Sequence, residues 1–214
     1  LPLTSLVVVE NTTNKGGGAC WDYAELEKIQ HICAENGLSY HLDGARLFNA
    51  LVAKNETPNQ YGKLFDSISI CLSKGLGAPI GSLLLSSEKN IQKAIRIRKL
   101  FGGGMRQVGY LAAAGIYALD NHVSRLSEDH QRAMTLGETL KKSAWVAKVE
   151  PVETNIIIFQ LHEQLNEKTF LSELEKHQIR IISMGEGKLR IVTHLDFTDV
   201  MLEKVVDVLK NMPI

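Results

Sequence analysis

The chain has 214 residues, of which 44% are hydrophobic, and its 24 basic side chains equal its 24 acidic ones in number. This length allows one large hydrophobic core and a second, smaller one. The balanced charge argues against a nucleic-acid or membrane-surface partner, and no apolar run reaches the roughly 20 residues of a membrane-spanning helix. Cys20, Cys33 and Cys71 are widely spaced, so we expect reduced thiols, no metal and a cytoplasmic location.

The first half of the chain alternates short apolar runs with helical patterns, which is typical of an α/β fold with a mostly parallel sheet. Asp22 is expected to cap the first helix, and Glu25 would complete a capping box. Further helices are expected over 45–52, 88–101 and 107–123. The expected strands are 5–10, 38–43, 67–72 and 82–87.

The second half begins with a long polar helix at about 124–143 and continues as a small α+β pattern. We therefore expect part of a large domain over 1–122 and a small C-terminal domain over 123–214. Four strands are few for a covered parallel sheet, so further strands are expected from residues outside this chain or from another chain. In the small domain we expect strands over 155–161, 179–183 and 188–193 and helices over 169–178 and 199–212.

The stretch "YHLDGARLFNA", residues 40–50, carries the first chemical signal. Asp43 stands at the carboxyl end of an apolar strand and is followed at once by glycine, where open α/β sheets place ligand-binding groups. Two structural alternatives remain open. Asp43 is also a favoured residue for capping the helix over 45–52, and Arg46 is compatible with a surface position.

The stretch "SISICLSKGLGAPIGSLLLSS", residues 67–87, places Lys74 after another apolar strand. Parallel strands bring both carboxyl ends to one edge of the sheet, so we expect Lys74 near Asp43. A buried ammonium there would be costly unless it is paired or chemically consumed. Pyridoxal phosphate satisfies both groups, because the amine forms a Schiff base and the carboxylate pairs with the pyridinium nitrogen. A solvated lysine in a turn is the alternative, and the nearby glycines permit close backbone approach.

Four motifs, spread in order over nearly the whole chain, together carry a family resemblance. They are "HLDGARLFNA", "SICLSKGLGAPIGSLL", "RKLFGGGMRQVGYLAAAGIYAL" and "LRIVTHLD". The sequence resembles the low-specificity L-threonine aldolases, which belong to the β-eliminating lyase group within the aspartate-aminotransferase-like fold. The resemblance implies a C-terminal part of that fold, with a small C-terminal α+β domain.

The same resemblance implies an activity and an assembly. The expected reaction is the pyridoxal-phosphate-dependent cleavage of L-threonine or L-allo-threonine to glycine and acetaldehyde. It would act in threonine catabolism and glycine biosynthesis. The family implies a homo-oligomer, a dimer or a homotetramer, and the small-residue helix over 107–121 suits close packing.

The resemblance also implies roles for the residues at the expected sheet edge. Lys74 matches the lysine that holds the cofactor, and Asp43 matches the partner of its ring nitrogen. Arg46 matches an arginine that lines the pocket for both substrate and cofactor. Ser73 and Asn11 match cofactor neighbours.

Two further arginines are implied in binding anionic groups, which suits a planar two-donor fork. Arg190 matches the arginine that binds the substrate α-carboxylate, and Arg106 matches one that reaches the cofactor phosphate, often from a neighbouring subunit. The alternatives are that Arg190 is exposed on an edge strand and that Arg106 merely follows a glycine turn.

The segment after the first strand departs from the family pattern. Thr13 in "ENTTN" stands where many relatives have a histidine. The glycine-rich stretch 16–21 lacks the spacing of a phosphate-binding motif, so we expect a flexible loop near the site. His41 is expected to be a core histidine whose hydrogen bonds are satisfied, and not a catalyst. The base of the reaction is expected outside this chain or as a bound water.

Two other functions remain as alternatives. One is a different pyridoxal-phosphate-dependent aldolase or β-eliminating lyase that acts on larger β-hydroxy amino acids. The other is a truncated, non-catalytic chain that retains Lys74 and Asp43 and serves only as an assembly partner.

Overall fold

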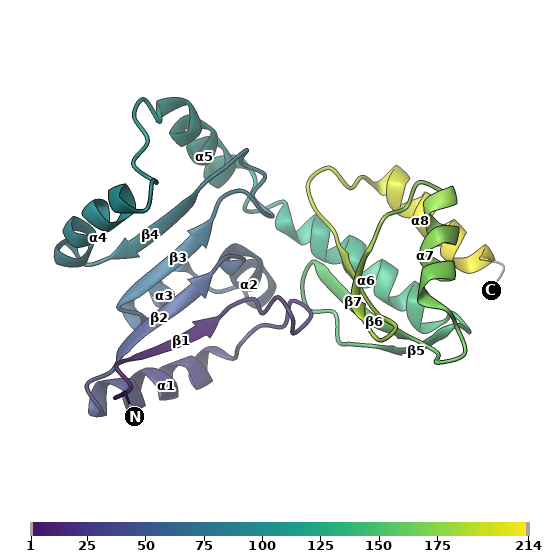
Figure 1. The fold of residues 1–214 in the computed structure, drawn as a ribbon, viewed down its shortest axis with the longest axis horizontal. Coiled ribbons are helices and arrows are strands. Elements are labelled where there is room, and N and C mark those ends of the chain that lie inside the picture. The colour runs from purple at the N-terminus through teal and green to yellow at the C-terminus, as the bar shows by residue number, and fades with distance from the viewer. Residues whose placement is uncertain (1, 213–214) are drawn as a thin grey trace. The chain divides into compact units, whose positions relative to one another are not determined.

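The computed structural model describes residues 2–212, which divide into two compact units (Figure 1). The first unit runs up to Thr12 and continues over Cys20–Arg125. The second unit starts at Leu126 and also takes in the separate segment Thr13–Ala19. The boundary between the two units therefore lies after Arg125. The sequence did not predict that a short segment near the start of the chain belongs to the second unit.

The first unit contains a four-stranded sheet in the order β1-β2-β3-β4 (Figure 1). Its strands are β1 (Leu6–Glu10), β2 (Ser39–Gly44), β3 (Ser67–Cys71) and β4 (Ser82–Ser86). The first three strands are parallel, and β4 pairs antiparallel with β3. The expectation of a mostly parallel sheet is confirmed, and the carboxyl ends of the three parallel strands lie at the same end of the sheet.

One face of this sheet carries the hydrophobic core of the first unit. Alternate residues of a strand point to opposite faces, and those on this face pack against α1 (Tyr23–Glu35), α2 (Leu47–Lys54) and α3 (Pro58–Leu64). Burial of this apolar surface drives the packing of the three helices against the sheet. The core residues are Val9, Leu26, Cys33, Tyr40, Leu42, Leu47, Leu51, Tyr61, Phe65, Ile68 and Ile70.

The helix caps differ in part from the sequence pattern. Asp22 caps α1 as expected and accepts a hydrogen bond from the Ala24 backbone N–H at 3.0 Å. Glu25 instead pairs with Lys28 at 2.6 Å, so the capping box expected at α1 is wrong. A capping box forms at α3, where Thr57 and the residue three positions later bond reciprocally.

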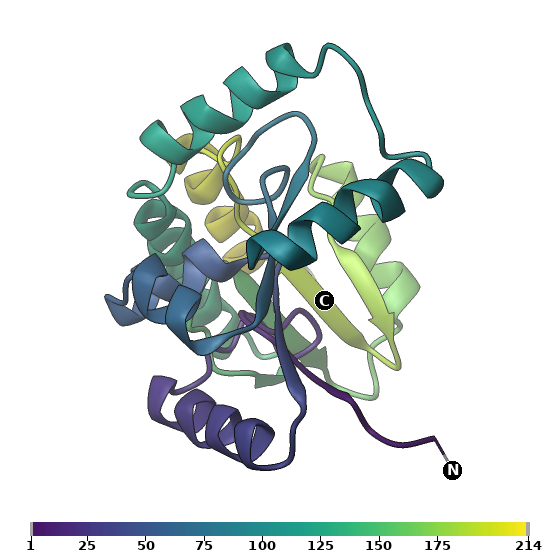
Figure 2. The ribbon, with the colours of Figure 1, turned by 90° about the vertical axis from the view of Figure 1, so that its left-hand side faces the viewer.

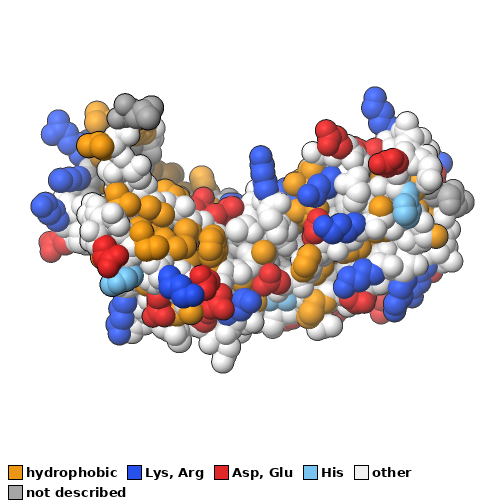
Figure 3. Space-filling model, turned by 90° about the horizontal axis from the view of Figure 1, so that it is seen from below, with side chains coloured by type: hydrophobic (Ala, Val, Ile, Leu, Met, Phe, Trp, Pro, Cys, Tyr) orange, Lys and Arg blue, Asp and Glu red, His pale blue; other side chains and the backbone are white. Residues whose placement is uncertain are grey.

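The helices α4 (Glu88–Leu100) and α5 (Gly109–Asn121) are largely exposed, and Figure 2 shows them in teal, joined by an extended connection. No residue of α4 is buried, and in α5 only Gly115 and Ala118 are. The edge strand β1 also has exposed apolar side chains, and Figure 3 shows hydrophobic side chains gathered on the first unit. Large exposed apolar side chains in these regions include Leu6, Val8, Leu100, Phe101, Tyr110 and Tyr117.

The second unit packs helices against an antiparallel sheet in the order β5-β6-β8-β7. The strands are β5 (Val146–Val149), β6 (Ile156–Leu161), β7 (Ile182–Gly185) and β8 (Lys188–Val192). The helices are α6 (Leu126–Lys141), α7 (Glu167–Lys176) and α8 (Asp199–Asn211). The core residues of the second unit include Leu136, Leu140, Trp145, Ile157, Phe159, Phe170, Leu174 and Leu189.

The sequence pattern missed β5 and, in the first unit, α3. It also placed the start of β7 too early.

Candidate active site

Asp43 and Lys74 follow neighbouring parallel strands to the same end of the sheet. Asp43 lies at the end of β2, where its direct partner across the ladder is Ser69 of β3. Lys74 comes just after Cys71, the last residue of β3. A carboxylate and an amine therefore stand at the carboxyl end of two adjacent strands, where open α/β sheets place their ligands.

Lys74 lies in a turn whose backbone is held by hydrogen bonds. The Gly77 N–H donates to the Lys74 carbonyl at 2.9 Å, and the Leu72 N–H donates to the Gly81 carbonyl at 2.9 Å. Gly77 and Gly81 have φ values of 71° and 121°, which disfavour any residue with a Cβ. The Lys74 side chain itself is exposed, so the expected cost of a buried ammonium does not arise in this chain.

Asp43 is half-buried, and only one of its oxygens is used locally. Oδ1 accepts a hydrogen bond from the Ala45 N–H at 3.2 Å. Helix α2 begins after Arg46, its N-cap residue, so Asp43 does not cap this helix. Within the part of the chain that the structure describes, Oδ2 accepts no hydrogen bond, which leaves it available to a ligand N–H.

The face of the sheet opposite the core is polar around Asp43. His41 precedes it on the same face, and its Nδ1 is 2.7 Å from the Ser67 hydroxyl. His41 is hydrogen-bonded, as expected, but it is half-buried and lies outside the hydrophobic core, so the expectation of a core histidine is wrong. Ser69, beside Asp43, continues this polar surface on β3. The neighbours of Asp43 on this face of β2 and β3 are therefore small or hydrogen-bonding side chains.

The other predicted cofactor residues take up different positions in the first unit. Ser73 is exposed beside Lys74, and Arg46 is half-buried directly before α2. Arg106 is exposed in the connection between α4 and α5 and makes no hydrogen bond or ion pair with any described residue. The structure therefore brings Asp43, Ser73 and Lys74 to one sheet end, whereas no contact joins Arg106 to them.

Arg190 belongs to the second unit and lies on β8, between β6 and β7. The alternative of an exposed edge strand is therefore wrong. Its Nη1 donates a hydrogen bond to Asn14 Oδ1 at 2.7 Å, whereas its Nε is buried and has no partner. Sequence reasoning did not select Asn14, because 176 residues separate it from Arg190 and no local pattern marks the contact.

The glycine-rich stretch after β1 is a bonded turn, and the expectation of a flexible loop is wrong in this respect. The Thr13 N–H donates to the Ala19 carbonyl at 3.0 Å, and the Gly18 N–H donates to the Thr13 carbonyl at 2.8 Å. Thr154 Oγ1 also donates to the Gly18 carbonyl at 2.7 Å. Gly17 and Gly18 are buried, so the turn is part of the packed second unit.

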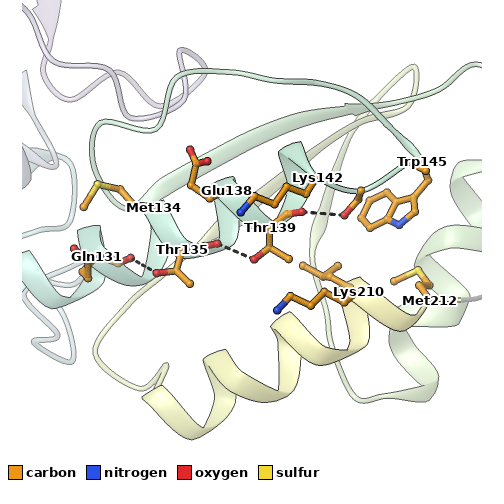
Figure 4. Close-up of a pocket in the computed structure, with 12 residues that line it drawn as sticks. Gln131, Met134, Thr135, Glu138, Thr139, Lys142, Trp145, Lys210 and Met212 are labelled. Atoms are coloured by element: carbon orange, nitrogen blue, oxygen red, sulfur yellow. Dashed lines mark hydrogen bonds between the residues drawn. The ribbon is translucent and has the colours of Figure 1, made fainter.

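A separate groove of about 660 Å³ lies between α6 and α8 in the second unit. Figure 4 shows that its hydroxyl groups are committed to backbone carbonyls of their own segment. Thr135 donates to Gln131, Thr139 to Thr135, and Ser143 to Thr139. With its hydroxyls engaged, the groove resembles a helix–helix seam more than a reaction centre. Among the described residues no cluster of three His, Cys, Asp or Glu side chains suits a metal ion, and no helix is long and apolar enough to cross a membrane.

Comparison of the sequence with known proteins identifies the family of this chain. The family model described as "Beta-eliminating lyase" matches residues 2–164. The chain belongs to the β-eliminating lyase family. The low specificity L-threonine aldolase of Escherichia coli (strain K12) is 42% identical over 202 residues, which cover 94% of this chain and 58% of that protein.

Solved structures place this β-eliminating lyase family member in the expected fold class. Leishmania major threonine aldolase superposes with a TM-score of 0.81 at 24% identity, covering 97% of this chain and 61% of that one. A PLP-dependent aminotransferase from Streptococcus suis 89-1591 superposes with a TM-score of 0.70 at 18% identity, covering 97% of this chain and 57% of that one. These likenesses confirm the aminotransferase-like fold. The chain spans little more than half the length of the curated relatives that it matches.

Proposed function

We propose that this chain is part of a pyridoxal-phosphate-dependent aldolase that cleaves L-threonine and L-allo-threonine to glycine and acetaldehyde. The observation that carries the proposal is the placement of Asp43 and Lys74 at the carboxyl ends of β2 and β3. This donor set fits the cofactor, because an amine and a carboxylate with an unused oxygen match its aldehyde and its ring N–H. The 42% identity to a low specificity L-threonine aldolase supports the substrate.

Each residue at the sheet end has a distinct task in this proposal. Lys74 supplies the amine that holds the cofactor, and its exposed position gives the side chain access to the ligand. Asp43 uses Oδ2 to keep a proton on the ring nitrogen, while the bond from Ala45 to Oδ1 fixes the carboxylate. When bound, pyridoxal phosphate supplies an electron sink for the pair released by carbon–carbon cleavage. Ser73 and Arg46 lie close in sequence to these two groups and would contact the cofactor, and Arg46 also the substrate.

Two arginines would hold the anionic ends of the ligands. Arg190 has a buried Nε without a partner, and an amino-acid carboxylate is the acceptor that a guanidinium binds in planar, two-point geometry. Arg106, exposed and without a partner among the described residues, would meet the cofactor phosphate. In this proposal Arg106 reaches the phosphate site when the subunits assemble.

For the assembly we propose a homo-oligomer, a dimer or a homotetramer. The proposal is supported by the apolar side chains that α4 and α5 expose, because contiguous exposed apolar surface is typical of protein interfaces. We also propose a cytoplasmic location and a role in threonine catabolism and glycine formation. The location is supported by the lack of a disulfide among Cys20, Cys33 and Cys71.

The experiment is an assay of the full-length protein with L-threonine, L-allo-threonine and phenylserine, with and without added cofactor. Lys74→Ala should abolish turnover together with the absorbance at about 420 nm that lysine-bound pyridoxal phosphate gives. Lys204→Ala removes an exposed lysine of α8 and should leave both unchanged. Retained absorbance in Lys74→Ala would overturn the role of this lysine.

The products decide between the proposal and its alternatives. Acetaldehyde and glycine in equal amounts support a threonine aldolase. Efficient benzaldehyde release from phenylserine without acetaldehyde release from threonine would indicate a different aldolase. A colourless full-length protein without turnover would indicate a non-catalytic assembly partner.

A further inference from the structure

The position of Asn14 is fixed by the folded turn that contains it. Backbone hydrogen bonds close the turn on both sides of Asn14, from Thr13 to Ala19 and from Gly18 to Thr13. Thr154, which precedes β6, then donates a hydrogen bond to the Gly18 carbonyl at 2.7 Å. These bonds restrict the backbone on either side of Asn14, so its side-chain amide is presented to β8 at a defined place.

The hydrogen bond to Asn14 uses Nη1 of the Arg190 guanidinium and leaves its Nε without a hydrogen-bond partner. Nη1 donates to Asn14 Oδ1 at 2.7 Å, and Nε is buried without a hydrogen-bond partner. Buried donors without a partner are rare in folded proteins, and each one calls for an explanation. Nε and Nη2 form the side edge of the guanidinium, whose two parallel N–H bonds match the two oxygens of a carboxylate.

The chemistry of the contact preserves the positive charge of Arg190. Asn14 is neutral, so it accepts a hydrogen bond without neutralising the guanidinium. No Asp or Glu among the described residues forms an ion pair with Arg190. A carboxylate at position 14 would hold the same nitrogen but would compete electrostatically with an anionic ligand.

We propose that Asn14 is a positioning residue for the substrate carboxylate. By accepting the Nη1 hydrogen bond, Asn14 sets the rotation of the Arg190 guanidinium so that Nε and Nη2 meet the α-carboxylate of an amino acid. The inference rests on the proposed function, in which Arg190 binds that carboxylate. It adds a residue that fixes orientation without touching the reacting atoms.

The test compares Asn14→Ala, Asn14→Asp and Arg190→Lys with the control Lys15→Ala in the full-length holoenzyme. Lys15 is the exposed neighbour of Asn14 in the same turn. Asn14→Ala should raise KM for L-threonine by about 10-fold or more with kcat changed by less than about 3-fold, because ground-state and transition-state binding of the carboxylate fall together. Asn14→Asp should also raise KM, and Lys15→Ala should change neither constant.

A second readout separates positioning from a general loss of structure. Glycine has an amine and a carboxylate, whereas ethanolamine has the amine but no carboxylate. The binding of each is measured by titration, with the absorbance of the bound cofactor as the signal. Asn14→Ala should weaken glycine binding by about 10-fold and leave ethanolamine binding unchanged. Equal weakening of both ligands would overturn the inference. If the alanine variant does not fold, Asn14→Leu provides the same comparison, because leucine is close to asparagine in size and has no oxygen to accept the Nη1 hydrogen bond.

Arg190→Lys distinguishes this inference from the function on which it rests. If this variant raises KM and Asn14→Ala does not, the positioning role fails and the carboxylate role of Arg190 stands. If Arg190→Lys leaves KM and glycine binding unchanged, the carboxylate role fails and the positioning role fails with it.

Discussion

Asp43 of β2 and Ser69 of β3 are direct partners across two parallel strands, on the face of the sheet opposite the hydrophobic core. Their neighbours along the strands, Leu42 and Ile68, point to the other face and are buried in that core. The strand alternation thus separates the core face from an opposite face that is polar at Asp43 and Ser69 and carries the exposed apolar side chains of β1. A substitution at Asp43 that preserves its shape therefore reports on chemistry more than on packing.

Asp43→Asn is expected to keep the fold and lose activity. Asparagine can still accept the Ala45 N–H bond through Oδ1, but it carries no charge to pair with a protonated ring nitrogen. Removal of such preorganised charge stabilisation lowers turnover by on the order of 100-fold or more. The measurement is kcat with L-threonine in the full-length enzyme, and Asp207→Asn on the exposed face of α8 is the control. Turnover within about 3-fold of the wild type would exclude Asp43 as the partner of the ring.

Gly18→Ala is expected to destabilise the turn around Asn14. Gly18 has a φ of 75°, and a Cβ there would collide with Thr154 Oγ1 and lie 3.2 Å from Ile156 Cβ. Strain and collision together should lower the free energy of unfolding by about 2–4 kcal/mol. Gly37→Ala is the matched control, because its φ is 64° but no atom lies within 4 Å of the new Cβ. Denaturant unfolding should show about 1 kcal/mol for this control, and equal losses at both sites would show that the collision is unimportant.

Tyr61→Phe is expected to destabilise the first unit through a lost hydrogen-bond relay. The Tyr61 hydroxyl accepts from Asn11 Nδ2 at 3.1 Å and donates to Glu56 Oε2 at 2.7 Å. Burial raises the pKa of Tyr61, and the bond to Glu56 raises it further, so the phenol stays protonated. Phenylalanine leaves the buried Asn11 amide without this partner, at a cost of about 1–3 kcal/mol in denaturant unfolding.

Tyr23→Phe supplies the comparison for this variant. The Tyr23 hydroxyl donates to the Gln60 carbonyl at 3.2 Å at an exposed site, where water replaces the lost bond. Its effect should be below about 0.5 kcal/mol. A larger loss at Tyr23 than at Tyr61 would contradict the importance of the relay.

The buried side chain of His130 is expected to make the second unit sensitive to acid. Burial lowers the pKa of His130, and the nearby Asp129 opposes this effect only in part. The unfolded chain, with an ordinary pKa of about 6.5, therefore binds a proton at a higher pH than the folded one. The resulting loss of stability begins as the pH falls through about 6.5 and continues to the lower folded pKa.

The measurement is the midpoint of denaturant unfolding at about pH 7.5 and about pH 5.5, for the wild type and for His130→Gln. The wild type should lose stability between these values, and the variant should show a smaller slope. An identical slope in both proteins would assign the acid sensitivity to other groups.

The sequence predicted the sheet end because its signal is local. An apolar strand that stops at Asp43 and another that stops shortly before Lys74 already imply a common edge if the strands are parallel. Elements with mixed patterns were harder to predict. β5 is four residues long with a lysine inside it, and α3 begins with Pro58 and contains Gly62, so neither has a regular apolar period.

Contacts between distant residues account for what the sequence did not reveal. Asn14 meets Arg190 and Gly18 meets Thr154 across more than a hundred residues, and no local period records such pairs. Glycines in series at 16–18 indicated flexibility by composition. Tertiary hydrogen bonds turned the same residues into an ordered part of the second unit, because glycine permits the positive φ that the turn requires.

The closed turn also sets the pattern of change that evolution can explore there. A Cβ at Gly16 would collide with the Thr13 hydroxyl, and Gly17 and Gly18 have φ values near 75° that other residues rarely adopt. Lys15 is exposed and carries no such restriction. In a saturation library selected for growth that depends on the product formed by this enzyme, we expect many residue types to be tolerated at Lys15. We expect few or none besides glycine at the three glycines that follow it.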